Sequence, residues 1–235
     1  MDYYLSSRSK RTLKPTAGAP AVLESRTSTT KARGQETRAR IVEAAIETLK
    51  REGFGGASAR AIARTGGFNQ ALVFYHFGSV RDLLLAALDE TSARRMARYR
   101  EVVDHAETFQ ELIAAASEVY REDLASGHIK VLAEMIAGAS SIPELGPEIV
   151  RRIEPWIDFA RDAVARVSST LPFPVPVPPE EAAFGIVALF LGIELLTHLE
   201  GDGTRSYRLF KLGSQLGAMA GLLTGTPPAR GSGGE

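Results

Sequence analysis

The sequence predicts an all-α protein in two parts, and three observations support this prediction. Apolar residues recur at helical spacing along most of the 235 residues. Near the N-terminus, a tight glycine turn joins two short helical segments. Charge is divided along the chain, because residues 1–100 contain 18 Lys and Arg but 9 Asp and Glu, whereas residues 101–235 contain 10 and 19. We therefore expect a basic N-terminal part that approaches phosphates and an acidic C-terminal part that phosphates repel.

The composition limits the kinds of site that the chain can hold. Its length allows one large or two small domains with a full core. The chain has no cysteine, which excludes disulfides and thiolate metal sites and fits a cytoplasmic protein. The four histidines lack metal-ligand spacing, and the sequence has no nucleophile elbow, phosphate-binding loop or dinucleotide fingerprint. We expect no enzyme, no metal and no cofactor.

Residues 1–34 are basic, rich in Ser and Thr, and interrupted by prolines. They are expected to form a disordered arm. The arm lacks the apolar region of a secretory signal. It either adds contacts to phosphates or to the minor groove, or it is a solvated leader without a role.

The first helix is expected over residues 35–52, where apolar residues recur at four-residue spacing and form one stripe. Gly53 ends this helix. The stripe should pack against the apolar residues of the next two segments and give a three-helix unit. It consists of Ile41, Val42, Ala45, Ile46 and Leu49.

The two short helices follow within residues 58–78. Ser58 is expected to cap the first of them, and the pair Gly66-Gly67 ends it, because glycine adopts positive φ readily. Asn69 is a plausible cap for the second, which Gly78 ends. Two helices joined by a tight turn form a helix-turn-helix, whose second helix enters the DNA major groove.

A third helix begins at the box formed by Ser79 and Asp82 and is expected to reach about Tyr99. The alternative is that all these helices are core helices of another bundle, with their aromatic residues merely packed. Asn69, Gln70 and His76 argue against it, since they place hydrogen-bonding groups on a very short helix that does not need them for burial. Glutamine can bind adenine edges and arginine can bind guanine edges.

The segment FNQALVFYHFGSVRDLL, residues 68–84, resembles the recognition-helix signature of TetR-family transcriptional regulators. The preceding TRARIVEAAIETLKREGFGGAS, residues 37–58, resembles the first helix of that family and its glycine-terminated end. The resemblance extends from residue 37 to about residue 88. Beyond it, the chain resembles the family only in length and helicity.

This resemblance implies DNA contacts for individual residues. Val80 replaces the usual phosphate-contacting lysine, a contact that Arg81 can take over, and Phe74 replaces the more usual tyrosine. Phosphate contacts are implied for Ser58, Tyr75 and His76. Contacts to base edges are implied for Arg60, Gln70, Ala71, Leu72 and Phe74, alongside the polar Asn69.

The C-terminal part is expected to be helical over residues 109–124, 129–137, 147–168, 180–200 and 204–224, with a loop at 140–147 and an extended connector at 171–179. Residues 182–199 are apolar enough for a membrane span. Glu194 and His198 lie within that stretch and its flanks are soluble helices, so burial in a bundle is favoured and no membrane is expected.

The resemblance also implies a pocket within a regulatory domain. The large or adaptable side chains available to line it are shared between several helices, and half of them are expected to be ordinary core. They are Phe109, Tyr120, His128, Met135, Trp156 and Phe159.

The last two helices contain glycines at helical spacing. Gly213, Gly217 and Gly221 fall on one face, and Gly185 and Gly192 are seven residues apart. Glycine inside a helix costs about 0.5–1 kcal/mol relative to alanine, so a close helix crossing is expected. That crossing is either a dimer interface or packing within one subunit.

The sequence therefore predicts a cytoplasmic, homodimeric repressor that a small apolar or amphipathic effector releases from a double-stranded DNA operator. The expected organisation is an arm (1–34), a DNA-binding domain (35–82), a ligand-binding and dimerisation domain (83–226) and a flexible tail (227–235). The alternative is a small-molecule-binding helical protein with weak or lost DNA binding, which Val80, Phe74 and the net charge of zero favour.

Overall fold

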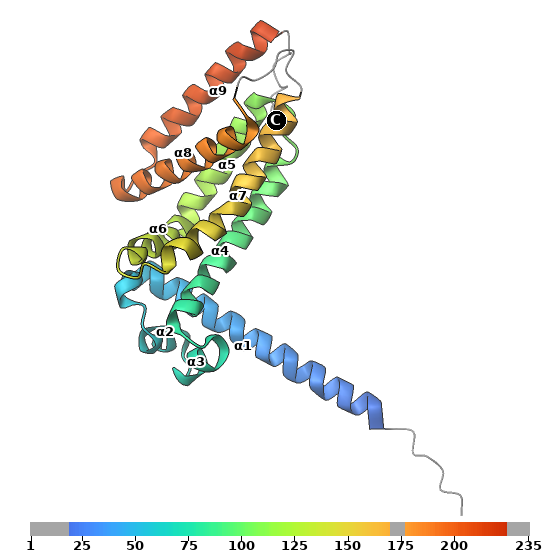
Figure 1. Ribbon diagram of the computed structural model, residues 1–235, viewed down its shortest axis with the longest axis vertical. Helices are drawn as coiled ribbons and strands as arrows, with labels where there is room; N and C mark the ends of the chain where they lie inside the picture. The colour runs from blue at the N-terminus through green and yellow to red at the C-terminus, as the bar shows by residue number, and fades with distance from the viewer. Residues whose placement is uncertain (1–18, 170–176, 225–235) are drawn as a thin grey trace, which may run out of the picture. The chain divides into compact units, whose positions relative to one another are not determined.

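A computed structural model of the chain describes residues 19–169 and 177–224, with side chains from residue 31 to 219 except at 125 and 126. Within these ranges every regular element is an α-helix (Figure 1), so the predicted fold class is confirmed. Residues 1–39 and 40–235 are separate compact units. The helices are α1 (Ala19–Gly56), α2 (Ala59–Gly66), α3 (Ala71–Phe77), α4 (Val80–Val103), α5 (Phe109–Ser126), α6 (His128–Ala139), α7 (Leu145–Ser168), α8 (Pro179–Glu200) and α9 (Thr204–Thr224).

Helix α1 begins at Ala19, so the predicted start at residue 35 is wrong. Pro20 falls in the first turn, where its missing N–H is not needed, and the residues after it include good helix formers such as Ala, Leu, Glu and Arg. The rest of the predicted arm, residues 1–18, lies outside the described residues. At the other end, Gly53 breaks the helix with φ 71° and ψ 179°, a conformation that is essentially restricted to glycine.

A first apolar core connects the N-terminal helices with the bundle. The stripe of α1 packs with Ile62 of α2 and Val73 of α3, as predicted, and also with Leu83 of α4. The same core also includes residues of α6 and α7, among them Met135 and Ile149. The predicted division at residue 82 therefore falls in the first turn of a helix, α4, that belongs to both regions.

Helices α4 to α9 form the C-terminal bundle, in which α7 packs against α8 and α5 packs against α9 (Figure 1). Its own core surrounds Tyr99, Val119 and Ala163. Helix α5 begins with a capping box, in which the Thr108 hydroxyl accepts the N–H of Glu111 and the Glu111 carboxylate accepts the N–H of Thr108. The bounds of α5 to α9 differ from the predicted ones by no more than two residues at each end.

Candidate functional site

Local hydrogen bonds fix the helix-turn-helix. The Ser58 hydroxyl accepts the N–H of Ala61 at 3.2 Å, and the Asn69 side chain accepts the N–H of Ala71 at 2.9 Å. Gly67 has φ 66° and ψ 39°, the left-handed conformation that the turn requires. A Cβ atom at Gly66 would lie 2.2 Å from a ring carbon of Phe68, so only glycine allows this close approach.

Polar contacts hold α2 against α1. The buried Thr48 hydroxyl donates to the Ala44 carbonyl at 2.7 Å and lies 3.0 Å from the Thr65 hydroxyl. One guanidinium nitrogen of Arg64 lies 3.0 and 3.1 Å from the two carboxylate oxygens of Glu52. Hydrogen bonds from Arg51 and Arg64 hold the pKa of Glu52 below its usual value. These contacts orient α2 without using any residue of α3.

Helix α3 is divided between a buried face and an exposed face. Val73 is fully buried, whereas Phe74 is 51% exposed and Tyr75 is 81% exposed. Two neighbouring exposed aromatic side chains form an apolar patch of the kind that marks an interaction site. The ring of His76 lies edge-on to that of Tyr75, with 4.9 Å between centroids. The exposed face therefore offers aromatic and polar groups at the end of the unit formed by residues 40–235.

Most of the predicted DNA-contacting residues lie on the surface of α2, the turn, α3 and the start of α4. Leu72 is half-buried and packs against the core, and His76 is also half-buried. Arg81 is exposed and lies 3.7 Å from Asp82, while Val80 packs against the core. The exposed members are Ser58, Arg60, Asn69, Gln70, Ala71, Phe74, Tyr75 and Arg81. Their individual contacts to DNA remain predictions.

Comparison with known proteins supports the family resemblance of the helix-turn-helix region. The sequence model described as bacterial regulatory proteins of the tetR family matches residues 41–87, which are the helix-turn-helix and the helices that support it. An uncharacterised HTH-type transcriptional regulator of Mycobacterium tuberculosis is 26% identical over 161 residues, which cover 68% of this chain and 80% of that protein. Residues 41–87 thus match the DNA-binding region of the TetR family of bacterial regulators. The resemblance identified from the sequence is thereby confirmed.

Other similarities agree with this family. The HTH-type transcriptional regulator UidR of Escherichia coli is 34% identical over 70 residues, 30% of this chain and 36% of UidR. A TetR-family regulator from Cytophaga hutchinsonii has the same fold, with a TM-score of 0.67, 18% identity and coverage of 79% of this chain and 95% of its own. A TetR regulator from Chloroflexus aurantiacus gives a TM-score of 0.66 at 20% identity, covering 78% and 95%.

The bundle of the regulator contains a cavity of about 140 Å³ among α4, α5, α6, α7 and α8. Its wall is mostly apolar. Of the predicted pocket residues, His128, Trp156 and Phe159 line this cavity. Trp156 donates its indole N–H to the Ser92 hydroxyl at 2.9 Å, which fixes the ring against α4. Helical spacing alone did not indicate which face of each helix borders the cavity.

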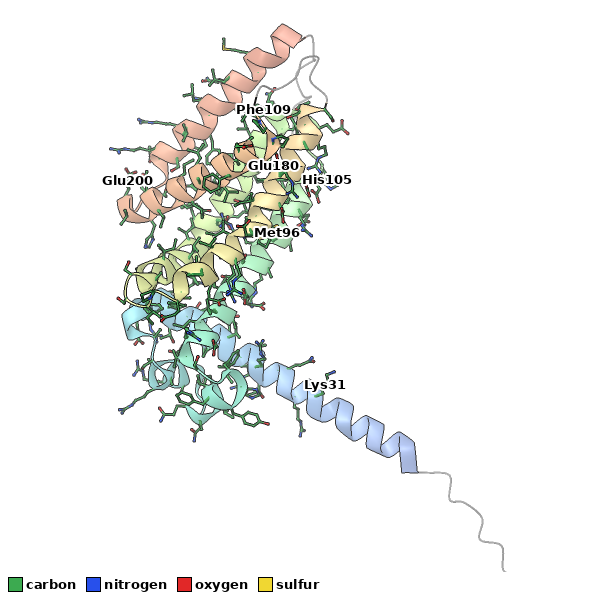
Figure 2. The ribbon with its side chains drawn as sticks, in the orientation of Figure 1. Lys31, Met96, His105, Phe109, Glu180 and Glu200 are labelled. Carbon is green, nitrogen blue, oxygen red and sulfur yellow. The ribbon has the colours of Figure 1, made fainter. Side chains whose placement is uncertain are left out.

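The other three predicted pocket residues do not line the cavity, and the prediction is corrected for them. Phe109, labelled in Figure 2, is half-exposed at the start of α5 and lies beside Gly217 of α9. Tyr120 is buried, and its hydroxyl is hydrogen-bonded to that of Thr197. Met135 is buried in the core shared with α1. Each fills space between helices that the sequence could not place next to one another.

A buried charged cluster borders the cavity, and sequence reasoning missed it. The Arg95 guanidinium of α4 forms a two-pronged ion pair with Glu194 of α8. Its Nε donates to Asp123 of α5 at 2.6 Å, and the Tyr99 hydroxyl donates to the same carboxylate at 3.2 Å. A glutamate inside the apolar stretch 182–199 was the available signal, because buried charges require a partner. The predicted neighbour of Glu194, His198, is exposed instead.

Burial changes the proton affinity of several groups near this cluster. Desolvation, with Arg95 and Lys50 adding repulsion, lowers the pKa of His128 to about 3, so its imidazole is neutral at pH 7. Desolvation raises the pKa of Asp123, although Arg95 opposes this effect. Desolvation also raises the pKa of Tyr99.

The glycines of α9 contradict the prediction of a dimer interface on their face. A Cβ atom at Gly213 would lie 3.5 Å from a methyl of Ile113, and one at Gly217 would lie 3.6 Å from the Cα of Gln110. Both glycines thus face α5 of the same subunit, where an added Cβ atom would make an ordinary van der Waals contact. The surroundings of Gly221 lie outside the described residues.

The glycines of α8, unlike those of α9, do not face another helix of the subunit. Gly185 and Gly192 have no other atom within 4 Å of a built Cβ. With Leu189, Leu196 and Leu199 they follow the spacing of one outward stripe, on which Leu196 is 60% exposed. By length and apolar composition α8 is a candidate membrane span, and most of it is not buried within the subunit. Its ion pair with α4 connects it to the bundle.

Proposed function

We propose that this regulator is a homodimeric, cytoplasmic repressor that leaves its operator when a small molecule occupies the cavity among α4 to α8. The support is that two helices take part in both regions. Helix α4 follows directly after α3 and lines the cavity, and α6 lines the cavity and packs against α1. A ligand that changes the position of either helix therefore acts on the helix-turn-helix without an intervening linker.

One contact carries this proposal. The Glu134 carboxylate of α6 accepts the backbone N–H of Phe54 at 2.8 Å, at the break in α1. On the next turns of the same helix, His128 and Leu132 line the cavity, and Gly138 admits the ring of Phe54, since a Cβ there would lie 2.5 Å from it. Helix α6 thus connects the cavity with the segment that orients α2.

The dimer is proposed to form through α8 and α9. One helix-turn-helix reads too few base pairs for useful specificity, so a second copy is needed. Exposed apolar residues form a stripe on each helix, and the stripe of α9 lies about a quarter turn around the helix from the glycines that face α5. The α9 stripe consists of Leu209, Leu212, Leu216 and Met219. A two-fold interface would bury the stripes of both copies.

The test of DNA binding is a gel shift with the DNA upstream of the regulator's own gene. Arg60→Ala, on the proposed DNA face, should weaken the shift, because it removes a cation or a base contact. Arg100→Ala, which changes an arginine that is also exposed at the far end of α4, is the matched control and should bind as the wild type does. Equal loss in both variants, or binding to unrelated DNA with the same affinity, would contradict the operator proposal.

A further inference from the structure

The charged groups in the wall of the cavity are already bound to partners of opposite charge. Among the described residues that line it, these groups are Arg95, Arg152 and Glu194. Arg95 forms ion pairs with Glu194 and with Asp123. Arg152 pairs with one carboxylate of α4 and one of α7. A charged ligand therefore meets no charge in this part of the wall that lacks a counter-charge.

The other titratable side chains of the wall, His128 and Tyr99, carry no charge at pH 7. Desolvation, with repulsion from Arg95 and Lys50, lowers the pKa of His128 to about 3. Desolvation raises the pKa of Tyr99 above its usual value. A charged group on a ligand would thus compete with an existing ion pair or lose its water without a new partner, and both are costly. The wall favours an uncharged ligand.

One hydroxyl of the wall retains a donor for a ligand. The Ser92 hydroxyl accepts the indole N–H of Trp156 at 2.9 Å, and a hydroxyl also has one proton to donate. No acceptor for this proton is found among the described residues. Because Ser92 lines the cavity, an oxygen of a bound molecule can accept the proton there.

Aromatic rings border the same part of the cavity. The ring of Tyr99 lies edge-on to those of Trp156, Phe159 and Phe190, at centroid distances of 5.3, 6.3 and 5.9 Å. All four residues line the cavity, and a further ring can pack against them in the same manner. The volume of about 140 Å³ is close to the roughly 150 Å³ of an apolar protein cavity that holds benzene. One ring with a short substituent is of the right size.

We infer that the cavity binds a small uncharged aromatic molecule with a carbonyl or ether oxygen, which accepts the hydroxyl proton of Ser92 while the ring packs against Tyr99 and Trp156. This inference rests on the proposed function, since it names the chemical class of the effector. The apolar wall removes the ring from water, and the single hydrogen bond fixes its orientation.

The first test compares three probes that share one ring and one planar branched substituent: acetophenone, benzoate and benzamidine. At pH 7 the first is neutral, the second is an anion and the third is a cation. We expect calorimetric titration without DNA to show acetophenone binding at least about tenfold more tightly than either ion, because a buried ion lacks a partner. Equal or tighter binding of either ion, or no binding of acetophenone up to its solubility, would overturn the inference.

The second test locates the hydrogen bond. In α-methylstyrene a methylene group replaces the carbonyl oxygen of acetophenone. Ser92→Ala should weaken acetophenone by about two- to tenfold more than α-methylstyrene, the effect of one neutral hydrogen bond. Since α-methylstyrene cannot accept this bond, its affinity reports any displacement of Trp156 caused by the substitution. Ser117→Ala, in a half-buried serine of α5 outside the cavity wall, is the control and should change neither affinity. An equal change for both probes in Ser92→Ala would contradict the role of Ser92.

The two proposals fail in different ways. Binding is measured without DNA, so a neutral aromatic ligand that binds but does not release the operator would contradict the proposed repressor mechanism and leave the ligand class intact. An operator that is released by a charged ligand in this cavity would contradict the ligand class and leave the mechanism intact.

Discussion

The hydrogen bond between Glu134 and Phe54 allows a quantitative test of the connection between cavity and DNA-binding helices. Glu134→Ala removes the acceptor at 2.8 Å and leaves a backbone N–H in a partly buried place without a partner. A bond to a charged group contributes about 1.5–3 kcal/mol, and partial exposure reduces this value. We therefore expect the free energy of unfolding to fall by about 1–2 kcal/mol. Glu134→Gln retains an oxygen acceptor without charge and should lose about half as much.

The assay is urea unfolding followed by circular dichroism, combined with operator binding. Glu154→Ala, an exposed glutamate of α7, is the control and should change the free energy of unfolding by less than about 0.5 kcal/mol. Glu134→Ala should still bind a cavity ligand, but that ligand should release less of the DNA. The reasoning is refuted if Glu134→Ala is as stable as the control and responds to the ligand as the wild type does.

Three further predictions follow from the described residues. Gln70→Ala should change the preference for particular base pairs by about 1–3 kcal/mol, whereas His76→Ala should weaken the binding of all DNA sequences alike. A binding-site selection in which Gln70→Ala keeps the wild-type preference would contradict the role of Gln70. Because folded His128 has a pKa of about 3 and an unfolded histidine one of about 6.5, the unfolded chain binds more protons between these values. The free energy of unfolding should then fall as the pH drops below about 6.5, by up to about 1.4 kcal/mol per pH unit, and urea titrations of His128→Gln should show a smaller fall. Gly217→Leu should lower the free energy of unfolding of the subunit by about 1–3 kcal/mol through overpacking against α5. Leu196→Asp should instead give a folded monomer in analytical ultracentrifugation. A dimeric Leu196→Asp protein would exclude the α8 stripe from the interface.

The features that the sequence predicted are those that neighbouring residues determine. Ser58 caps α2 through an atom three residues away, Asn69 accepts the N–H of Ala71 just before α3, and Gly67 turns the chain by its own φ. Helix bounds in the C-terminal part follow from local periodicity and from glycine and proline. The start of α1 was missed, because the residues after Pro20 were judged by their polarity, although good helix formers are among them.

The features that the sequence did not predict depend on contacts between distant segments. Arg95 and Glu194 are 99 residues apart, and neither position shows which helix faces the other. The same reason explains the glycines of α9, since a small residue indicates a close crossing but not whether the neighbour is α5 or a second copy. It also explains why the sequence wrongly placed three residues in the wall of the cavity, namely Phe109, Tyr120 and Met135.

The core that joins α1 with α6 and α7 has a consequence for how the chain melts. Val131, Met135, Leu145 and Ile149 complete the packing around the helix-turn-helix, so its core is finished only by residues of the bundle. The chain should therefore unfold from residue 40 onward as one cooperative unit, without a separate transition for the DNA-binding helices. A molecule that occupies the cavity and raises the melting temperature would then stabilise the helix-turn-helix by the same amount, even when it removes that motif from DNA.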